Sequence, residues 1–241
     1  LNRQYLESRV SDPDSVIYGI NTGFGSLCNI QISNENLEKL QENLVLSHAC
    51  GMGDLVPEYL CKLIHLLKIF NLSHGCSGVR VELVQKLIDL YNAGITPVIY
   101  QMGSLGASGD LAPLAHLSLP LLGVGKVYLG GEMMDSKKAL EIKNITPIVL
   151  KSKEGLALLN GTQFSLAYAS VIVAEAKSIF NLANKIAALS MDAYVCDISP
   201  FDHLLHDIRP HKGQLITAAQ IHKLLSESGV RTIEKLSVQD P

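Results

Sequence analysis

One stretch predicts the fold class of this 241-residue chain: Glu154–Tyr194, EGLALLNGTQFSLAYASVIVAEAKSIFNLANKIAALSMDAY. Apolar residues recur along it at helical spacing, and Gly161 marks a candidate break. A helical segment of about forty residues exceeds an ordinary globular helix and is typical of helix bundles. We therefore expect a mainly α-helical protein in which a long-helix bundle begins near Gly155.

The first half of this stretch has the length of a membrane span. Gly155–Ala174 carries no formal charge over about twenty residues. It contains Asn160, Thr162 and Gln163, which are unfavourable in the core of a bilayer. We interpret it as a deeply buried helix of a large assembly, and we expect no membrane partner.

Composition limits the class of protein further. Hydrophobic residues make up 47% of the chain and Trp is absent, so we expect a core of Leu, Ile, Val and Ala. The net charge is −3 and no basic stretch compensates it, which excludes an electrostatic footprint for nucleic acid. The five cysteines include no C-x-x-C pair. They indicate reduced thiols in a cytoplasmic protein, most of them buried as small hydrophobes.

Upstream of the long stretch, the pattern alternates between helices and one hairpin. We expect helices over 33–47 (with Ser33 as its cap), 57–73, 79–92 and 111–122, a short helix from 136, and another over 214–226. Gly130-Gly131 between two short extended runs predicts a hairpin. In 79–92 the apolar stripe is Val84, Leu87, Ile88 and Tyr91. We therefore expect a mixed, mostly helical domain over 1–154, followed by a truncated bundle over 155–241.

The tripeptide Ala107-Ser108-Gly109 can react with its own backbone. It lies in Gly103–His116, GSLGASGDLAPLAH. In a tight turn the Gly109 nitrogen can reach the Ala107 carbonyl carbon, and loss of two waters then gives a methylidene-imidazolone electrophile. Glycines supply the backbone angles that such a turn requires. The alternative is an ordinary glycine-rich turn that never cyclises.

Four segments carry a resemblance to the aromatic amino-acid ammonia-lyases, the histidine, phenylalanine and tyrosine lyases. They are Gly103–His116, Tyr18–Gly25 (YGINTGFG), Asn43–Gly53 (NLVLSHACGMG) and Leu159–Gln163 (LNGTQ). The resemblance runs through essentially the whole chain. It implies a fold of the fumarase/aspartase-like superfamily, and a methylidene-imidazolone formed autocatalytically from Ala107, Ser108 and Gly109 with no diffusible cofactor. It also implies a cytosolic homotetramer whose active sites are shared between subunits.

The resemblance assigns roles to four further residues. Tyr18 is implied to take the β-proton of the substrate; the alternative is a packing tyrosine. Asn160 is implied to bind the amino-acid moiety, the alternative being a helix-packing hydrogen bond. Gln239 is the last implied site residue of the chain. His48 is implied to recognise the substrate ring, although a single helical His is often structural.

Ser47-His48 carries the substrate assignment. The histidine lyases have Ser-His at these positions, the tyrosine lyases His-Leu and the phenylalanine lyases Phe-Leu. An imidazole can bond a polar ring, which Phe-Leu would leave unsatisfied. The resemblance therefore implies non-oxidative elimination of ammonia from L-histidine to trans-urocanate, the first step of histidine degradation. The alternatives are a tyrosine ammonia-lyase or aminomutase with the same prosthetic group, and an uncyclised, non-catalytic helical fragment.

Three remaining features complete the expectations. Asp110 is placed to cap the helix that follows the tripeptide. His203, His206 and His211 suggest a metal, but no Cys or carboxylate motif completes a tetrahedral set, so we expect none. In the resembled family further active-site residues follow the equivalent of Gln239-Asp240-Pro241. We therefore expect a fragment of about half of a longer enzyme.

Overall fold

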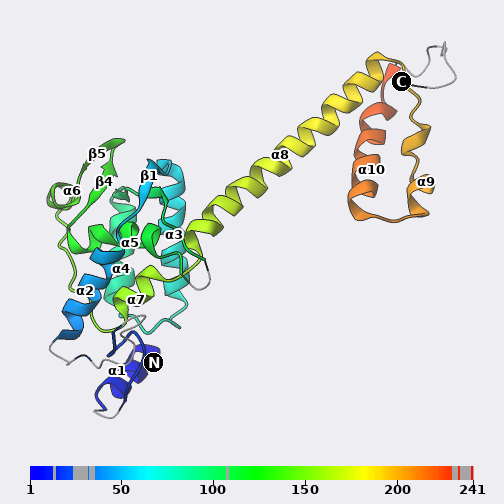
Figure 1. Cartoon of the computed structure of the whole chain (residues 1–241). Helices are drawn as coiled ribbons and strands as arrows, with labels where there is room; N and C mark the ends of the chain where they lie inside the picture. The colour runs from blue at the N-terminus through cyan, green and yellow to red at the C-terminus, as the bar shows by residue number, and fades with distance from the viewer. Residues whose placement is uncertain are drawn as a thin grey trace. The chain divides into compact units, whose positions relative to one another are not determined.

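The computed structural model describes residues 1–12, 15–23, 32, 36–106, 109–229, 233 and 240, and helices dominate it (Figure 1). The expected mainly α fold is confirmed. The contacts divide the chain into two compact units, Leu1–Ala169 and Ser170–Pro241. The domain boundary expected after residue 154 stays a prediction about the complete protein.

Most elements belong to the first unit. They are α1 (Asn2–Val10), α2 (Leu37–His48), β1 (Met52–Leu55), α3 (Glu58–Ser73), α4 (Val81–Asn92), β2 (Thr96–Pro97), β3 (Tyr100–Met102), α5 (Leu111–Ser118), the 3₁₀ helix η3 (Leu119–Leu122), β4 (Lys126–Leu129), β5 (Glu132–Asp135), α6 (Ser136–Lys143) and α7 (Glu154–Leu159). The long helix α8 (Gln163–Ala193) begins in this unit and continues into the second. The expected break near Gly161 is therefore confirmed.

Helix boundaries follow from local chemistry. Pro57 precedes α3, where its missing N–H costs nothing. The helix expected over 111–122 is α-helical only to Ser118, because Pro120 cannot donate an α-helical hydrogen bond and its ring crowds the preceding turn. α2 begins at Leu37 with Asn36 at the N-cap, and the predicted cap Ser33 lies outside the described residues.

Two small antiparallel sheets accompany the helices. The predicted hairpin is confirmed as β4–β5, with Lys126 opposite Asp135, and β2 joins it along β4. Pro97 is tolerated because β2 is an edge strand. β1 pairs with β3, with Met52 opposite Met102. This second pairing, which the sequence analysis did not predict, brings the segment after α2 beside the start of the glycine-rich loop.

The core of the first unit forms where α2, α3, α4, α5 and α7 pack on one another (Figure 1). Apart from Cys61, its buried hydrophobic residues are Leu, Ile, Val and Ala, as expected. Cys61, Cys50, Cys76 and Cys196 are free thiols, but only Cys61 is buried. The expectation that most cysteines are core residues is therefore wrong for the described ones. Burial raises the pKa of Cys61 to about 12.

The second unit contains the rest of α8, the 3₁₀ helix η4 (Ser199–Phe201), α9 (His203–Asp207) and α10 (Lys212–Ser226). Its core is small: Ala188, Ile221 and Leu225 are buried, with Met191, Ile198 and Phe201 packed against them. Asn184 donates a hydrogen bond to Gln220 at 2.9 Å and ties α8 to α10. Ala218 is buried as well, whereas many of the larger apolar residues of this unit are exposed.

Candidate active site

A backbone hydrogen bond joins the residues on the two sides of Ala107-Ser108. The Asp110 N–H donates to the Leu105 carbonyl at 2.6 Å, which closes the turn Leu105–Asp110. A Cβ built on Gly109 would lie 2.4 Å from the Leu105 oxygen, closer than any real Cβ contact. Only glycine fits there. Ala107 and Ser108 lie outside the described residues.

Asp110 fixes this turn with its side chain. Its carboxylate accepts hydrogen bonds from the Ser104 hydroxyl and, at 3.1 Å, from the Phe164 N–H. Asp110 occupies the N-cap position of α5, as expected, but no side-chain capping bond forms. Its φ of 85° is in the left-handed region, where a non-glycine residue is strained. The strain is held by contacts that reach from the start of the loop to the start of α8.

Asn160 lies next to the tripeptide through its own backbone. It ends α7 in an extended conformation, and the following Gly161 N–H donates to the Gly109 carbonyl at 2.9 Å. The Asn160 carbonyl accepts a hydrogen bond from Lys68 Nζ, also at 2.9 Å. The structure thus joins Asn160 and Gly109, two of the predicted site residues that lie far apart in the sequence.

His48 is the last residue of α2, half-buried, and its Nδ1 lies 2.8 Å from the Leu44 carbonyl. A carbonyl can only accept, so Nδ1 carries a proton and a neutral ring accepts at Nε2. Three residues later, Gly51 contacts the glycine-rich loop: a Cβ on Gly103 would lie 3.4 Å from the Gly51 Cα. The chain leaving His48 therefore runs directly against the start of that loop.

His116 supports this junction from α5. The Gly51 N–H donates to its Nε2 at 3.0 Å, so the proton of the neutral ring is on Nδ1. Its ring lies 5.0 Å from that of Tyr100, centroid to centroid. Burial lowers the pKa of His116, which keeps the ring neutral and able to accept. His116 ends the signature Gly103–His116, and no role was predicted for it from the sequence.

Tyr18 lies in a turn that is stabilised by hydrogen bonds between its own residues. Asn21, buried behind it, donates to the Ser15 carbonyl at 2.6 Å and accepts from the Ile17 N–H at 2.7 Å. The Gly19 N–H donates to the hydroxyl of the buried Thr22 at 3.0 Å. The Tyr18 side chain is 57% exposed. The predicted site residue Gln239 lies outside the described residues.

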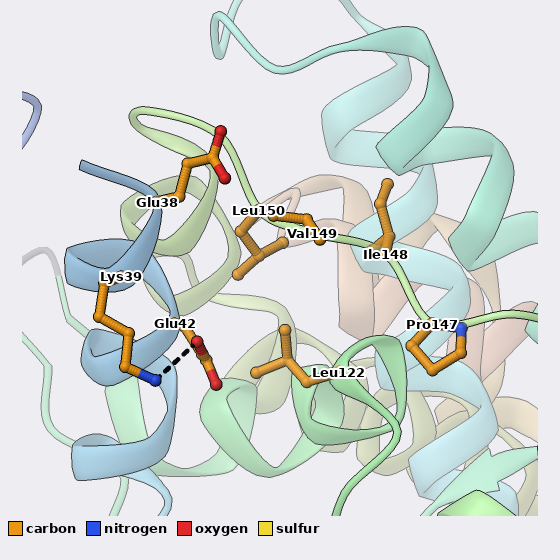
Figure 2. A pocket seen from close by; sticks show the side chains of 8 residues that line it. All are labelled: Glu38, Lys39, Glu42, Leu122, Pro147, Ile148, Val149 and Leu150. Atoms are coloured by element: carbon orange, nitrogen blue, oxygen red, sulfur yellow. Dashed lines mark hydrogen bonds and ion pairs between the residues drawn. The ribbon is translucent and has the colours of Figure 1, made fainter. Parts of the chain in front are cut away.

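No residue of the glycine-rich loop Gly103–Asp110 lines the pocket drawn in Figure 2. The pocket has a volume of about 440 Å³ and is lined by α2 (including Lys39 and Glu42), Leu122 and the extended segment 147–150. Lys39 and Glu42 pair across 3.0 Å at its edge. None of the predicted site residues lines it. We therefore locate the candidate site by its hydrogen bonds rather than by this cavity.

The three histidines considered for a metal lie in the second unit. His206 uses both ring nitrogens, Nε2 at 3.0 Å from the Pro200 carbonyl and Nδ1 at 2.8 Å from Gln214 Nε2. His203 Nδ1 lies 3.3 Å from an Asp202 carboxylate oxygen. Among the residues that the structure describes, no three His, Cys, Asp or Glu side chains are grouped to hold a metal ion.

Lys68 is the main polar residue of the site that the sequence analysis missed. It is fully buried on α3, and burial lowers its pKa to about 7, while the nearby Asp110 carboxylate works in the opposite direction. The signal was present as a lysine flanked by apolar residues (Leu66, Leu67, Ile69 and Phe70) in a helix that is apolar almost all round. A charge retained in such a position needs a partner, here the Asn160 carbonyl.

Comparisons with known proteins agree with one another. A family model described as aromatic amino acid lyase matches residues 2–241. Histidine ammonia-lyase of Streptococcus pyogenes serotype M49 is 46% identical over the whole chain, which covers 47% of that protein. Histidine ammonia-lyase of Legionella pneumophila is 48% identical over 97% of this chain and 46% of its own length. The chain thus spans about half the length of the curated relatives it matches.

Solved structures show the same relationship. Phenylalanine aminomutase of Pantoea agglomerans matches with a TM-score of 0.88 and 35% identity, over 95% of this chain and 44% of its own. Histidine ammonia-lyase of Trypanosoma cruzi matches with a TM-score of 0.83 and 37% identity, over 92% of this chain and 43% of its own. The fold described above is therefore shared with both a lyase and an aminomutase.

Proposed function

Because the chain belongs to the aromatic amino acid lyase family, we propose that the complete protein eliminates ammonia from L-histidine. The reaction is non-oxidative, gives trans-urocanate and is the first step of histidine degradation. The observation that carries the proposal is the closed turn Leu105–Asp110, in which only glycine fits at 109. The similarity to histidine ammonia-lyases at 46% and 48% identity supports the choice of substrate.

The residues of the turn fit a methylidene-imidazolone formed from Ala107, Ser108 and Gly109. Gly109 has no side chain to hinder its nitrogen, and its carbonyl is held by the Gly161 N–H. Asp110 holds the far end of the turn with its strained backbone and its carboxylate. Once formed, the group supplies an electrophilic carbon that ordinary side chains lack.

The other site residues bind the substrate and move its proton. Tyr18 takes the β-proton, and its exposure on a rigid turn leaves the phenol accessible to a ligand. His48 recognises the imidazole ring of the substrate. Because Nδ1 donates to the Leu44 carbonyl, Nε2 of the neutral ring is the nitrogen that accepts a hydrogen bond from the substrate ring N–H. Asn160 and Gln239 bind the amino-acid moiety. Since the β-proton is weakly acidic, the assembled site must also exclude water.

Supply of histidine and tyrosine, separately, to the purified complete protein tests the substrate. Urocanate formed only from histidine is the expected result. Coumarate or β-tyrosine from tyrosine would overturn it in favour of the alternative, a tyrosine lyase or aminomutase. That alternative is kept because an aminomutase is among the matching structures.

The intact mass of the protein tests the electrophile directly. A cyclised chain weighs less than its sequence by two waters, and Ser108→Ala, which removes the leaving hydroxyl, should show no loss. An unshifted mass of the wild-type protein would contradict the proposal and leave the second alternative, an uncyclised helical fragment.

The proposal includes a cytoplasmic homotetramer with shared active sites, an amino-acid substrate, and no nucleic-acid or membrane partner. Glu154–Ala193 is long and apolar enough to cross a membrane by length and composition alone, with a mean hydropathy of 1.4. Gln163 and Asn184 are buried polar residues within it. They favour a bundle helix, whose exposed apolar face is covered by other helices of the assembly.

A further inference from the structure

Lys68 is a buried lysine that the proposed reaction does not use. It lies on α3 with no exposed surface, and its Nζ donates a hydrogen bond to the Asn160 carbonyl at 2.9 Å. Removing an ammonium group from water is costly unless it is paired and hydrogen-bonded. Replacement of such a group by an apolar side chain of similar volume is often neutral for stability. Lys68 is therefore a costly residue for packing alone, and its bond to Asn160 indicates a role beyond filling the core.

The bond from Lys68 reaches the reactive turn through a single peptide group. The Asn160 carbonyl, which accepts from Lys68, and the Gly161 N–H belong to the same amide. That N–H donates to the Gly109 carbonyl at 2.9 Å. A positive donor on the oxygen of an amide polarises it and strengthens the bond made by its N–H. Lys68 thus acts on Gly109 without touching it.

The Gly109 carbonyl belongs in turn to an amide that is held at both ends. Its oxygen accepts from Gly161, and its N–H, that of Asp110, donates to the Leu105 carbonyl at 2.6 Å. This leaves Gly109 with little rotational freedom on its C-terminal side. Fixing a reacting group before it reacts removes an entropic part of the barrier.

We propose that Lys68 is a positioning residue for the cyclisation of Ala107-Ser108-Gly109: through the Asn160–Gly161 amide it holds Gly109 so that its nitrogen reaches the Ala107 carbonyl carbon. This inference rests on the proposed function, since it presumes that the tripeptide cyclises. It adds a residue of α3 to the machinery that makes the prosthetic group.

The step that Lys68 assists is balanced without any co-reactant. The Gly109 nitrogen forms a bond to the Ala107 carbonyl carbon. The former carbonyl oxygen leaves as one water with the amide hydrogens of Gly109 and Ser108. The Ser108 hydroxyl leaves as the second water with the α-hydrogen of the same residue, which creates the methylidene double bond. Nothing is oxidised or reduced by an external agent.

The test follows the intact mass of newly made complete protein over time. Lys68→Met keeps most of the apolar stem and removes the cation. We expect it to fold, as judged by circular dichroism, and to lose its two waters about ten- to a hundred-fold more slowly than the wild-type protein. Lys62→Met is the matched control, because Lys62 is a half-exposed lysine of the same helix that pairs with Glu58. It should mature at the wild-type rate.

Lys68→Arg separates charge from packing. It keeps a cationic donor and should mature faster than Lys68→Met. Equal rates for these two folded variants, or a wild-type rate in Lys68→Met, would overturn the assignment. A Lys68→Met protein that fails to fold would also overturn the assignment, because Lys68 would then be needed for the stability of the core. A wild-type protein that never loses two waters would instead contradict the proposed function, so the two failures are distinguishable.

Discussion

The first unit, Leu1–Ala169, encloses charged side chains, whereas the second, Ser170–Pro241, leaves many apolar ones in solvent. Lys68 and Glu154 are fully buried in the first unit, each with a hydrogen-bonded partner. In the second unit Leu189 is 70% exposed and Ile208 78%. An interior that holds charges in fixed positions can support chemistry, while exposed apolar faces indicate surfaces that further helices cover. The proposed electrophile and the proposed bundle therefore place different requirements on one chain.

Gly109→Ala should have the largest effect, because it removes the turn of the first unit that the proposed chemistry requires. The new Cβ would lie 2.4 Å from the Leu105 oxygen, so the turn must open. We expect no loss of two waters in the intact mass, and urocanate formation at background. Gly213→Ala on α10 is the control, since a Cβ there meets nothing within 4 Å. It should stabilise α10 by about 0.5 kcal/mol. A Gly109→Ala protein that matures normally would contradict the role of the turn.

Arg80→Met should have the next largest effect. Arg80 binds the buried Glu154 carboxylate with two bonds, Nε to Oε1 at 2.9 Å and Nη2 to Oε2 at 2.7 Å. Removing the guanidinium leaves the buried carboxylate without its cation, held by the backbone N–H groups of Arg80 and Lys151. We therefore expect the free energy of unfolding to fall by about 3 kcal/mol. Urea unfolding at neutral pH measures it. His203→Ala, which removes the partner of an exposed Asp202, should cost less than about 0.5 kcal/mol. A similar loss of unfolding free energy in both variants would contradict the difference between the buried and the exposed ion pair.

Leucine truncation compares the two units directly. Leu87→Ala empties a fully buried position on α4 and should cost about 3 kcal/mol. Leu189→Ala should cost less than about 0.5 kcal/mol if its face of α8 stays in solvent. We expect about 2 kcal/mol in the complete protein, because the proposed assembly covers that face. Thermal unfolding of the complete protein measures both, and a negligible effect of Leu189→Ala would argue against the assembly.

Acid should weaken the first unit through His65. Burial lowers its pKa to about 4 from an ordinary 6.5, so the folded protein keeps the ring neutral. This contribution to stability is present in full above pH 6.5 and is lost as pH falls toward 4, by up to about 1.4 kcal/mol per pH unit. Urea midpoints between pH 7 and 4 measure it. His65→Gln should flatten that dependence, whereas His203→Gln, at an exposed position, should leave it unchanged.

Elements governed by local rules were predicted from the sequence. α3 follows Pro57, β4–β5 follows from Gly130-Gly131, and the long helix breaks at Gly161 as expected. The buried face of α4 was only partly predicted. Leu83, Leu87 and Leu90 are buried there, rather than the stripe Val84, Leu87, Ile88 and Tyr91. Helical spacing gives the period of a stripe, but the packing partners decide which side turns inward.

Candidate site residues could be predicted where a sequence motif marks them. Residues that hold the motif in place through long-range contacts could not. The tripeptide, His48 and Asn160 are predicted site residues because sequence motifs mark them, and their roles stay predictions. The role of Lys68 depends on a contact between residues that lie 92 positions apart, and the Gly51–His116 bond spans 65. No local pattern encodes such distances. The β1–β3 pairing was missed for the same reason, since each strand is too short to show alternation.

The contacts of the Asp110 carboxylate determine when, during synthesis of the chain, the turn can be completed. This side chain accepts the Phe164 N–H from 54 positions downstream, and Gly161 reaches back to Gly109 in the same way. During synthesis the ribosome delivers Ala107-Ser108-Gly109 well before either donor exists. A nascent chain that stops short of residue 161 lacks both contacts. In the proposed maturation, the electrophile would thus form only after the start of α8 has docked against the turn, and unfinished polypeptides would not carry it.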